Sequence, residues 1–145
     1  MQMESSPGRT RVALASAVVL VLFYGCAVTP RVSTWDSPKR FKAKEVFTAA
    51  LQAGSEEAMQ LAGSDREGGT MSFRKHVGNG EMVLSVTIKD VGGIVQVRTT
   101  SSYAGEFLAI KGLHEEYINN FHVFLFRNLG ITDQSEKNID IREQS

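Results

Sequence analysis

Cysteine is almost missing from this chain of 145 residues, which contains only Cys26. A single cysteine cannot form an internal disulfide bond, so cysteine pairing gives no information about the redox compartment. An excess of charge of either sign is also missing, because 16 Lys and Arg residues balance 16 Asp and Glu residues. Without a strong positive field, binding of nucleic acid is not expected. The length allows one compact domain and hardly two.

Sequence motifs of catalytic and phosphate-binding sites are missing as well. The chain has neither a G-x-S-x-G nucleophile elbow nor a G-x-x-x-x-G-K-[ST] phosphate-binding loop. His114 and Glu115 begin like the H-E-x-x-H helix of zinc proteases, but Ile118 stands where the second histidine is needed. His114 and His122 lie about two helical turns apart, which is too far for one metal ion.

The remaining polar residues give no convergent catalytic set. Adjacent acidic residues, Glu56-Glu57 and Glu115-Glu116, diverge from each other and are expected at solvated helix ends. We therefore predict no catalytic residue, no cofactor and no metal site, and we expect a protein that is not an enzyme. The three histidines are expected at the surface or at the edges of the domain: His76, His114 and His122.

Long apolar runs are confined to the N-terminus. Residues 12–24 are apolar apart from Ser16, and they follow a polar segment that ends in Arg9 and Arg11. This order is typical of an export signal, and the run has the length of about 7–15 residues found in such signals. Continued through Val28, the run approaches the roughly 18–20 residues that cross a bilayer. An uncleaved membrane helix therefore stays open as the alternative.

The end of this run, Phe23-Tyr24-Gly25-Cys26, resembles the lipobox of bacterial lipoproteins. The resemblance implies cleavage between Gly25 and Cys26 and acylation of Cys26, with chains such as palmitate holding the protein on the membrane. Two or more acyl chains give stable anchoring, where a single chain gives only reversible binding. Ala27, in place of the aspartate that retains lipoproteins at the inner membrane, favours a periplasm-facing location on the outer membrane if the organism has one.

The segment after Cys26 is expected to be a linker over residues 26–43. It contains Pro30, Pro38 and several hydroxyl residues, and a basic cluster of Lys39, Arg40, Lys42 and Lys44 lies at its end. The cluster is either a solvated run that leads into a helix or a contact for anionic head groups. Trp35 is expected at the edge of the domain or at the membrane interface.

Residues 44–131 are expected to form one α+β domain. Apolar spacing predicts a helix over residues 44–53, ended by Gly54, and a final helix over residues 105–129, capped by Gly130. Between the helices, alternating segments separated by glycine turns predict a four-stranded antiparallel meander. The predicted order is α-β-β-β-β-α with both helices on one face of the sheet, followed by a flexible tail over residues 132–145 and preceded by a signal peptide over residues 1–25.

One turn of the meander carries a second resemblance. Asp65, Gly68 and Gly69 match the "helix, strand, D-x-x-G, strand" opening of several families of small, uncharacterised envelope lipoproteins. The resemblance implies an envelope protein with an α-β4-α domain, and these families mostly lack a known reaction.

These observations together predict a non-catalytic, lipid-anchored envelope protein whose domain binds an unknown protein partner or supports envelope assembly. The free sheet face, with Ser85, Thr87, Gln96 and Arg98, is the first candidate for the contact. A second candidate is a set of apolar residues off the main stripe of the last helix. The alternative function is binding of a small apolar ligand or lipid beneath that helix. The off-stripe residues are Leu108, Ile118 and Phe126.

Overall fold

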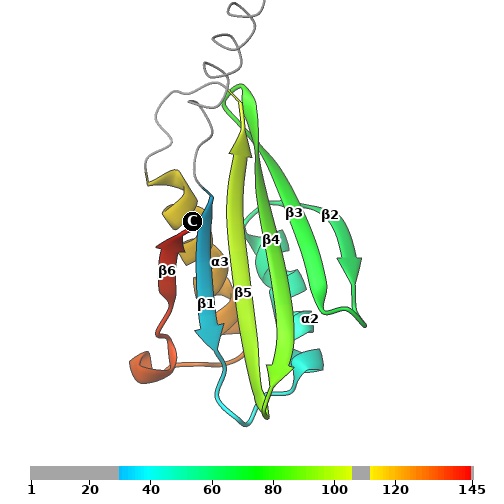
Figure 1. The fold of residues 1–145 in the computed structure, drawn as a ribbon, viewed down its shortest axis with the longest axis vertical. Helices are drawn as coiled ribbons and strands as arrows, with labels where there is room; N and C mark the ends of the chain where they lie inside the picture. The colour runs from blue at the N-terminus through cyan, green and yellow to red at the C-terminus, as the bar shows by residue number, and fades with distance from the viewer. Residues whose placement is uncertain (1–29, 106–111, 145) are drawn as a thin grey trace, which may run out of the picture.

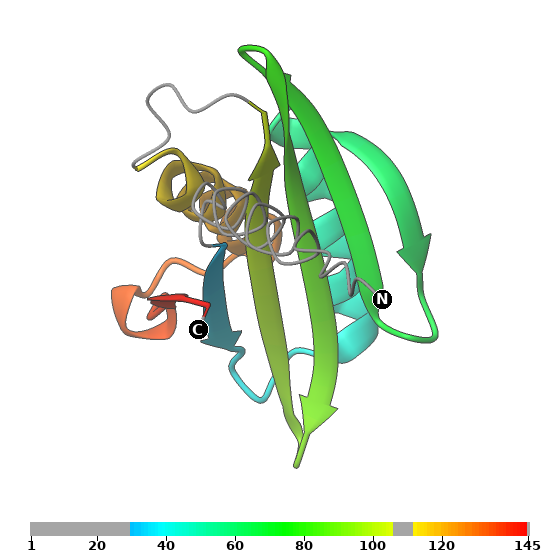
Figure 2. The ribbon, with the colours of Figure 1, turned by 45° about the horizontal axis from the view of Figure 1, so that its top comes forward.

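The computed structural model describes residues 30–105 and 112–144 of the chain. The described chain forms a six-stranded antiparallel sheet with two helices on one side, as Figures 1 and 2 show. The strands lie in the order β2-β3-β4-β5-β1-β6. The prediction of an α+β domain with both helices on one face is confirmed, whereas the prediction of four strands is wrong. The elements are β1 (Arg31–Asp36), α2 (Ala43–Glu56), β2 (Gln60–Asp65), β3 (Thr70–Val77), β4 (Gly80–Val91), β5 (Ile94–Ala104), α3 (Leu113–Asn128), the short 3₁₀ helix η2 (Gln134–Glu136) and β6 (Asp140–Glu143).

The predicted meander is present as β2 to β5. On β4 the side chains of Met82, Leu84, Val86 and Ile88 are all buried, which is the alternation expected of a strand with one dry face. The β4–β5 turn consists of Gly92 and Gly93, both at positive φ, as a two-residue hairpin turn of this kind requires.

β1 adds the first strand that the sequence pattern missed. It pairs antiparallel with β5, Arg31 opposite Ser101 and Asp36 opposite Gln96. The linker predicted over residues 26–43 is therefore wrong for residues 31–36. The physical reason is that β1 has the polar Ser33 on its buried side and the apolar Val32 on the opposite side. The strand therefore lacks the alternation of buried apolar and exposed polar residues that predicts a strand from sequence. Trp35 is 1% exposed and belongs to the core instead of the domain edge or the membrane.

β6 corrects the second boundary, since the flexible tail predicted over residues 132–145 contains both η2 and a paired strand. β6 lies antiparallel to β1, with Arg31 opposite Glu143. The Gln144 N–H donates to the Pro30 carbonyl at 3.0 Å, so the two ends of the described chain lie side by side. The domain consequently extends beyond the predicted residues 44–131.

Trp35 joins the two added segments to the rest of the fold. Its indole Nε1 donates to the Glu136 carbonyl at 2.8 Å. The Glu136 carboxylate accepts two hydrogen bonds from the Arg40 guanidinium, at 2.5 and 2.6 Å. Arg40 belonged to the predicted basic cluster, and its side chain holds η2 against the segment that leads into α2.

The helices cover the inner face of the sheet and contact each other. Gly54 lies inside α2 and does not end it, because the helix continues to Glu56. A Cβ atom at Gly54 would overlap the Phe73 ring, so this glycine permits close approach of α2 to β3. Gly130, at φ +69°, follows α3 as the predicted C-terminal cap. The described part of the last helix begins at Leu113, and β5 extends to Ala104, so the predicted start at Gly105 is wrong.

Candidate binding surface on the open face of the sheet

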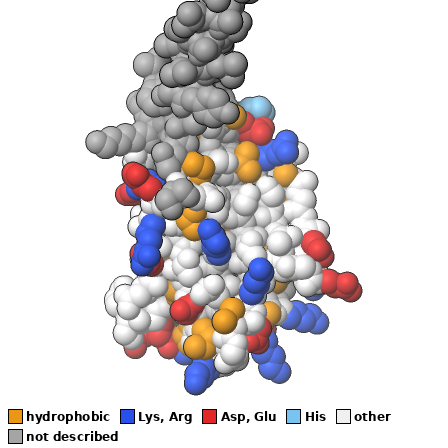
Figure 3. Space-filling view, viewed as in Figure 1, with side chains coloured by type: hydrophobic (Ala, Val, Ile, Leu, Met, Phe, Trp, Pro, Cys, Tyr) orange, Lys and Arg blue, Asp and Glu red, His pale blue; other side chains and the backbone are white. Residues whose placement is uncertain are grey.

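The side of the sheet opposite α2 and α3, called the open face below, carries mainly hydroxyl, amide and charged side chains. Strand register arranges them in rows. One row runs Ser72, Ser85, Thr100, Val32, and the next runs Thr70, Thr87, Arg98, Thr34. Figure 3, which views this face, shows mostly polar atoms across its middle with scattered cationic side chains. The four residues predicted to mark the free sheet face all lie on it: Ser85, Thr87, Gln96 and Arg98.

A hollow of about 360 Å³ lies over the centre of the open face and is called the β4–β5 groove. No lining residue is acidic or aromatic. Arg98 and Lys89 project there without a hydrogen bond or ion pair to any residue in the described ranges, while Gln96 donates to the Asp36 carboxylate at 3.0 Å. The groove is therefore cationic and rich in hydrogen-bond donors. It is lined by Ser85, Thr87, Lys89, Gln96, Arg98, Thr100 and Gln144.

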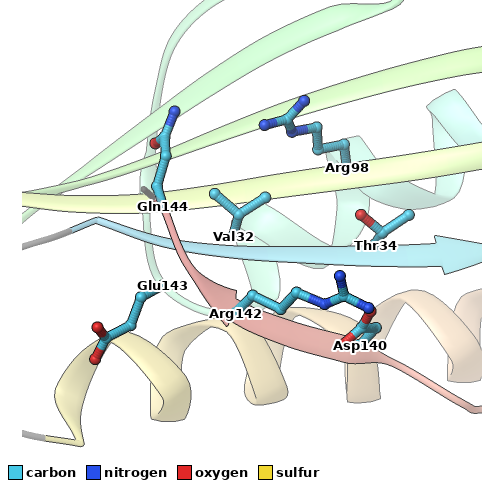
Figure 4. Close-up of a pocket in the computed structure, with 7 residues that line it drawn as sticks. All are labelled: Val32, Thr34, Arg98, Asp140, Arg142, Glu143 and Gln144. Atoms are coloured by element: carbon cyan, nitrogen blue, oxygen red, sulfur yellow. The ribbon is translucent and has the colours of Figure 1, made fainter.

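A second hollow of about 420 Å³, the β1–β6 groove, adjoins the first and shares Arg98 and Gln144 with it (Figure 4). Its other cation, Arg142, is already paired with Asp140 at 2.5 Å. Glu143 points away from Arg98 in this view. The unpaired positive charge of the two grooves is thus concentrated on Arg98 and Lys89. The β1–β6 groove is lined by Val32, Thr34, Arg98, Asp140, Arg142, Glu143 and Gln144.

The candidate residues predicted for the free face include Arg98 but not Lys89, Arg142 or Gln144. Lys89 follows the same alternation as Ser85 and Thr87 on β4, so the pattern alone could have placed it on this face. Arg142 and Gln144 belong to the C-terminal segment, which has too few apolar residues for a strand to be predicted there. Local pattern therefore gave no signal for them.

The inner face contains polar groups where apolar ones were expected. The prediction of surface or edge histidines is wrong for His114 and His122, which are 4% and 0% exposed, whereas His76 is exposed. Both histidines lie on α3, and on the strands that α3 covers three small polar residues of β1 and β5 are buried as well; His114 contacts one of these, Ser101. We call this set the buried polar strip: Ser33, Thr99, Ser101, His114 and His122.

The hydrogen bonds of the buried polar strip fix the tautomer of His122. Nδ1 of His122 donates to the Ile118 carbonyl at 2.8 Å, so its Nε2 is an acceptor. The Ser101 hydroxyl forms a hydrogen bond with Nδ1 of His114 at 2.9 Å and lies 3.0 Å from Met82 Sδ, a second acceptor for its proton. Both Nε2 atoms, together with the hydroxyls of Ser33 and Thr99, are buried without a partner among the described residues. Such groups cost about 1–3 kcal/mol each when they stay unpaired.

Ser101 and His114 are the one serine–histidine contact among the hydrogen bonds of the described residues. The pair does not have the geometry of an activated nucleophile, because no carboxylate orients the imidazole, whose Nε2 has no partner among the described residues. Ser101 is fully buried as well. The contact acts in packing of α3 on β5.

Burial also shifts the pKa values of these groups. It lowers the pKa of His122 to about 4, against a smaller opposing effect of the bond to Ile118. Burial lowers the pKa of His114 too, and the nearby positive charge of Arg31 acts in the same direction. Both imidazoles are therefore neutral at pH 7.

Glu57 corrects the expectation that the acidic pairs are solvated. It is almost fully buried at the end of α2, and burial raises the pKa of its carboxyl group. Asn120 donates to its Oε1 at 3.3 Å, and Lys75 donates to its backbone carbonyl at 3.2 Å. Glu56 instead pairs with Arg127 at 2.9 Å across the two helices. These carboxylates diverge, as the sequence predicted, and both serve to join elements.

The off-stripe residues of the last helix do not form a docking surface. Ile118 is fully buried, and Phe126 is 5% exposed with its ring 5.0 Å from that of Trp35. The docking surface required both to be exposed, and for Phe126 the reason that it is buried is its contact with Trp35 of β1. Leu108 lies outside the described residues.

The proposed lipidation and cleavage residues, Cys26 and Gly25, also lie outside the described residues, as does the whole predicted signal segment. Within residues 30–105 and 112–144, no helix is both long and apolar enough to cross a bilayer. In the same ranges, His, Asp and Glu side chains do not gather in groups of three that could hold a metal ion.

Comparisons with known proteins add the following. No family model and no curated protein matches the chain. The crystal structure of Ara h 8.0201 aligns with 70% of this chain and 97% of its own, with 6% identity and a TM-score of 0.41. The crystal structure of TTHA0849 from Thermus thermophilus aligns with 71% of this chain and 98% of its own, with 13% identity and a TM-score of 0.36.

The buried imidazole of His122 makes the fold acid-sensitive. Its pKa is about 4 in the folded chain and near its ordinary value of 6.5 in the unfolded chain, so the unfolded state binds the proton first as the pH falls. The free energy of unfolding should drop by about 3 kcal/mol between pH 6.5 and pH 4 from this group alone. Urea denaturation at a series of pH values measures the drop in the native protein, in His122→Gln and in the exposed-site control His76→Gln.

His122→Gln is expected to flatten the pH dependence and His76→Gln to leave it unchanged. Glu57, whose raised pKa acts in the opposite direction, is present in all three proteins and cancels in the comparison. Equal pH slopes for the native protein and His122→Gln would show that His122 is not buried in its neutral form.

Proposed function

We propose that this chain is a non-catalytic, membrane-tethered domain of the bacterial cell envelope that binds a protein partner through the open face of its sheet. The observation that carries the proposal is the unpaired Arg98 at the centre of a polar face, shared by two adjoining grooves. A cation in this position is available for a partner, whereas those at the edges of the face are paired within the chain. Acylated Cys26 is the proposed tether, on the periplasmic side of the outer membrane where the organism has one.

The place where the chain enters the domain supports the tether. Pro30 precedes β1 at the end of the sheet that also holds the β3–β4 turn, the upper end in Figure 1. Pro30 stands four positions after Cys26, and an extended chain spans at most about 3.3–3.6 Å per residue. An acyl anchor at Cys26 would therefore keep this end within roughly 14 Å of the membrane surface.

The proposal that the domain is not an enzyme is supported by the chemistry of the two faces. The β4–β5 groove offers cations and hydrogen-bond donors but no carboxylate to act as a general base. Two of the three histidines, His114 and His122, lie on the inner face and are buried, and the exposed His76 is not among the residues that line this groove. A binding site needs complementary charge and shape but no proton transfer, so the side chains of the groove suit binding.

The tether predicts a defined mass. When the full chain is expressed in a bacterial host and extracted from membranes, intact mass spectrometry should give residues 26–145 plus acyl chains. Cys26→Ala should remove the acyl mass and leave the signal segment attached. A full-length, unmodified mass for the native chain would instead support an uncleaved membrane helix over residues 12–28.

The docking face predicts a position-dependent cross-link. A photo-reactive amino acid replaces Thr87 in the β4–β5 groove or, as a matched control, Thr48 on the exposed side of α2. Irradiation of intact cells should give a discrete adduct from position 87 and none of the same mass from position 48. Arg98→Glu should abolish the adduct from position 87, because the reversed charge repels the partner. An adduct that persists unchanged in Arg98→Glu contradicts docking through this face.

A second candidate function, binding of a small ligand beneath α3, is supported by the buried polar strip. Four buried polar atoms there lack partners among the described residues, and one of them, Nε2 of His122, can only accept a hydrogen bond. An occupant must therefore present hydrogen-bond donors, as a hydroxyl group of an otherwise apolar molecule does. Ordered water satisfies the same requirement without any ligand.

Native mass spectrometry separates the two occupants. If a ligand fills the buried polar strip, the protein extracted from bacterial membranes carries an extra mass of small-molecule size beyond its covalent modifications. The double substitution Ser33→Ala, Thr99→Val removes two of the hydrogen-bonding groups and should lower the bound fraction at least several-fold. A protein that shows only its covalent mass contradicts this second function and assigns the strip to water.

A further inference from the structure

We infer that the β4–β5 groove recognises an extended acidic protein segment with carboxylates at alternate positions. The inference rests on the proposed function, whose partner it specifies by chemistry. It starts from the lining of the groove, which contains two free cations, three hydroxyls and two amides and lacks an acidic residue. Two like charges without a counter-ion repel each other, and an anion placed between them relieves that repulsion.

Strand register sets the spacing of the two cations. Thr87 lies opposite Arg98 and Lys89 lies opposite Gln96, so Lys89 and Arg98 are diagonal neighbours on the open face. Diagonal neighbours on an antiparallel pair are about 7–8 Å apart. In an extended chain, residues i and i+2 point to the same side and are separated by about 6.6–6.8 Å. Two carboxylates at i and i+2 of a partner strand therefore match Lys89 and Arg98.

The other lining groups favour this occupant over alternatives of different chemistry. Thr87, Thr100 and Gln144 can hydrogen-bond to the backbone and polar side chains of an extended segment. The groove has no aromatic ring for a sugar or a nucleobase to stack on, and no apolar wall for an acyl chain. The charge of Arg98 is planar and forked, which suits a carboxylate held through two hydrogen bonds.

The free cations also differ from every neighbouring cation of the face. Arg74 is within 3.8 Å of Glu81, and Arg142 is within 2.5 Å of Asp140. The acidic residues at the margins of the open face are thus paired with cations of the same chain. Asp36, also on this face, accepts a hydrogen bond from Gln96. The centre alone keeps unbalanced positive charge. A partner with paired carboxylates would complete the pattern of paired charges across the whole face.

The experiment uses the full chain in detergent and two fluorescein-labelled eight-residue peptides of equal composition and charge. One peptide alternates Glu and Ser, and the other has the order Glu-Glu-Ser-Ser repeated, which contains no glutamates two positions apart. Fluorescence anisotropy at low ionic strength should show at least fivefold tighter binding of the alternating peptide. Binding should weaken as salt is added, because exposed charges are screened.

Substitutions then assign the contacts. Arg98→Gln and Lys89→Gln should each weaken binding of the alternating peptide by about tenfold, as expected for loss of a hydrogen-bonded charge. Lys44→Gln, which removes one exposed cation on α2 on the other side of the domain, should leave the affinity unchanged. All four proteins should show the same circular dichroism spectrum, since the substituted side chains are exposed.

Each other outcome overturns a defined part of the argument. Equal affinity for the two peptides would contradict recognition of carboxylates at alternate positions. Equal affinity of Arg98→Gln and the native chain for the alternating peptide would contradict the β4–β5 groove as the binding site. Absence of peptide binding, together with an Arg98-dependent cross-link from position 87 in cells, overturns the acidic segment while docking through this face stands. Absence of both overturns the proposed docking face itself.

Discussion

The insertion of β1 between β5 and β6 is the constraint on which the rest of this structure depends. β1 makes hydrogen-bonded pairs on both edges, and Trp35 fixes its depth by packing inside the core and donating to the Glu136 carbonyl. Without β1, Phe126 would lose the ring that it packs against, and β6 would have no strand to join. The open face would also end at β5, so Arg98 would lie at an edge instead of between two grooves. A short segment of the sequence with little apolar character thus determines both faces of the sheet.

The sequence predicts an element of this fold where its apolar side chains point into the core and its polar side chains point to solvent. On β4 they do, since Met82 to Ile88 alternate cleanly with Ser85 and Thr87, and the strand and its open-face residues were predicted from the pattern alone. On β1 they do not, because Ser33 is inside and Val32 outside. The histidines of α3 were misplaced for the same reason. Imidazoles count as polar in any hydrophobicity pattern, although hydrogen bonds to Ile118 and Ser101 allow both to be buried.

The candidate site shows the same division. Arg98 could be assigned to the free face by counting along one strand, and its position there is what makes it a candidate. Its proximity to Lys89 needs the β4–β5 register, and its proximity to Gln144 needs the C-terminal segment to return beside β1. Contacts between residues far apart in sequence are decided by topology, which no local pattern contains. The sequence therefore predicts that Arg98 lies on the open face, but it does not predict the groove that Arg98 lines.

The adjacent ends of the described chain have a mechanical consequence. Pro30 and Gln144 are hydrogen-bonded neighbours at the start of β1 and the end of β6. A force that pulls these two ends apart acts across the strands and opens the β1–β6 pairs one after another, starting at Arg31 and Glu143. A force along the strands, applied to β1 at Arg31 and to β5 at Ile94, acts differently. It loads the β1–β5 pairs from Arg31 to Asp36 together instead of one after another.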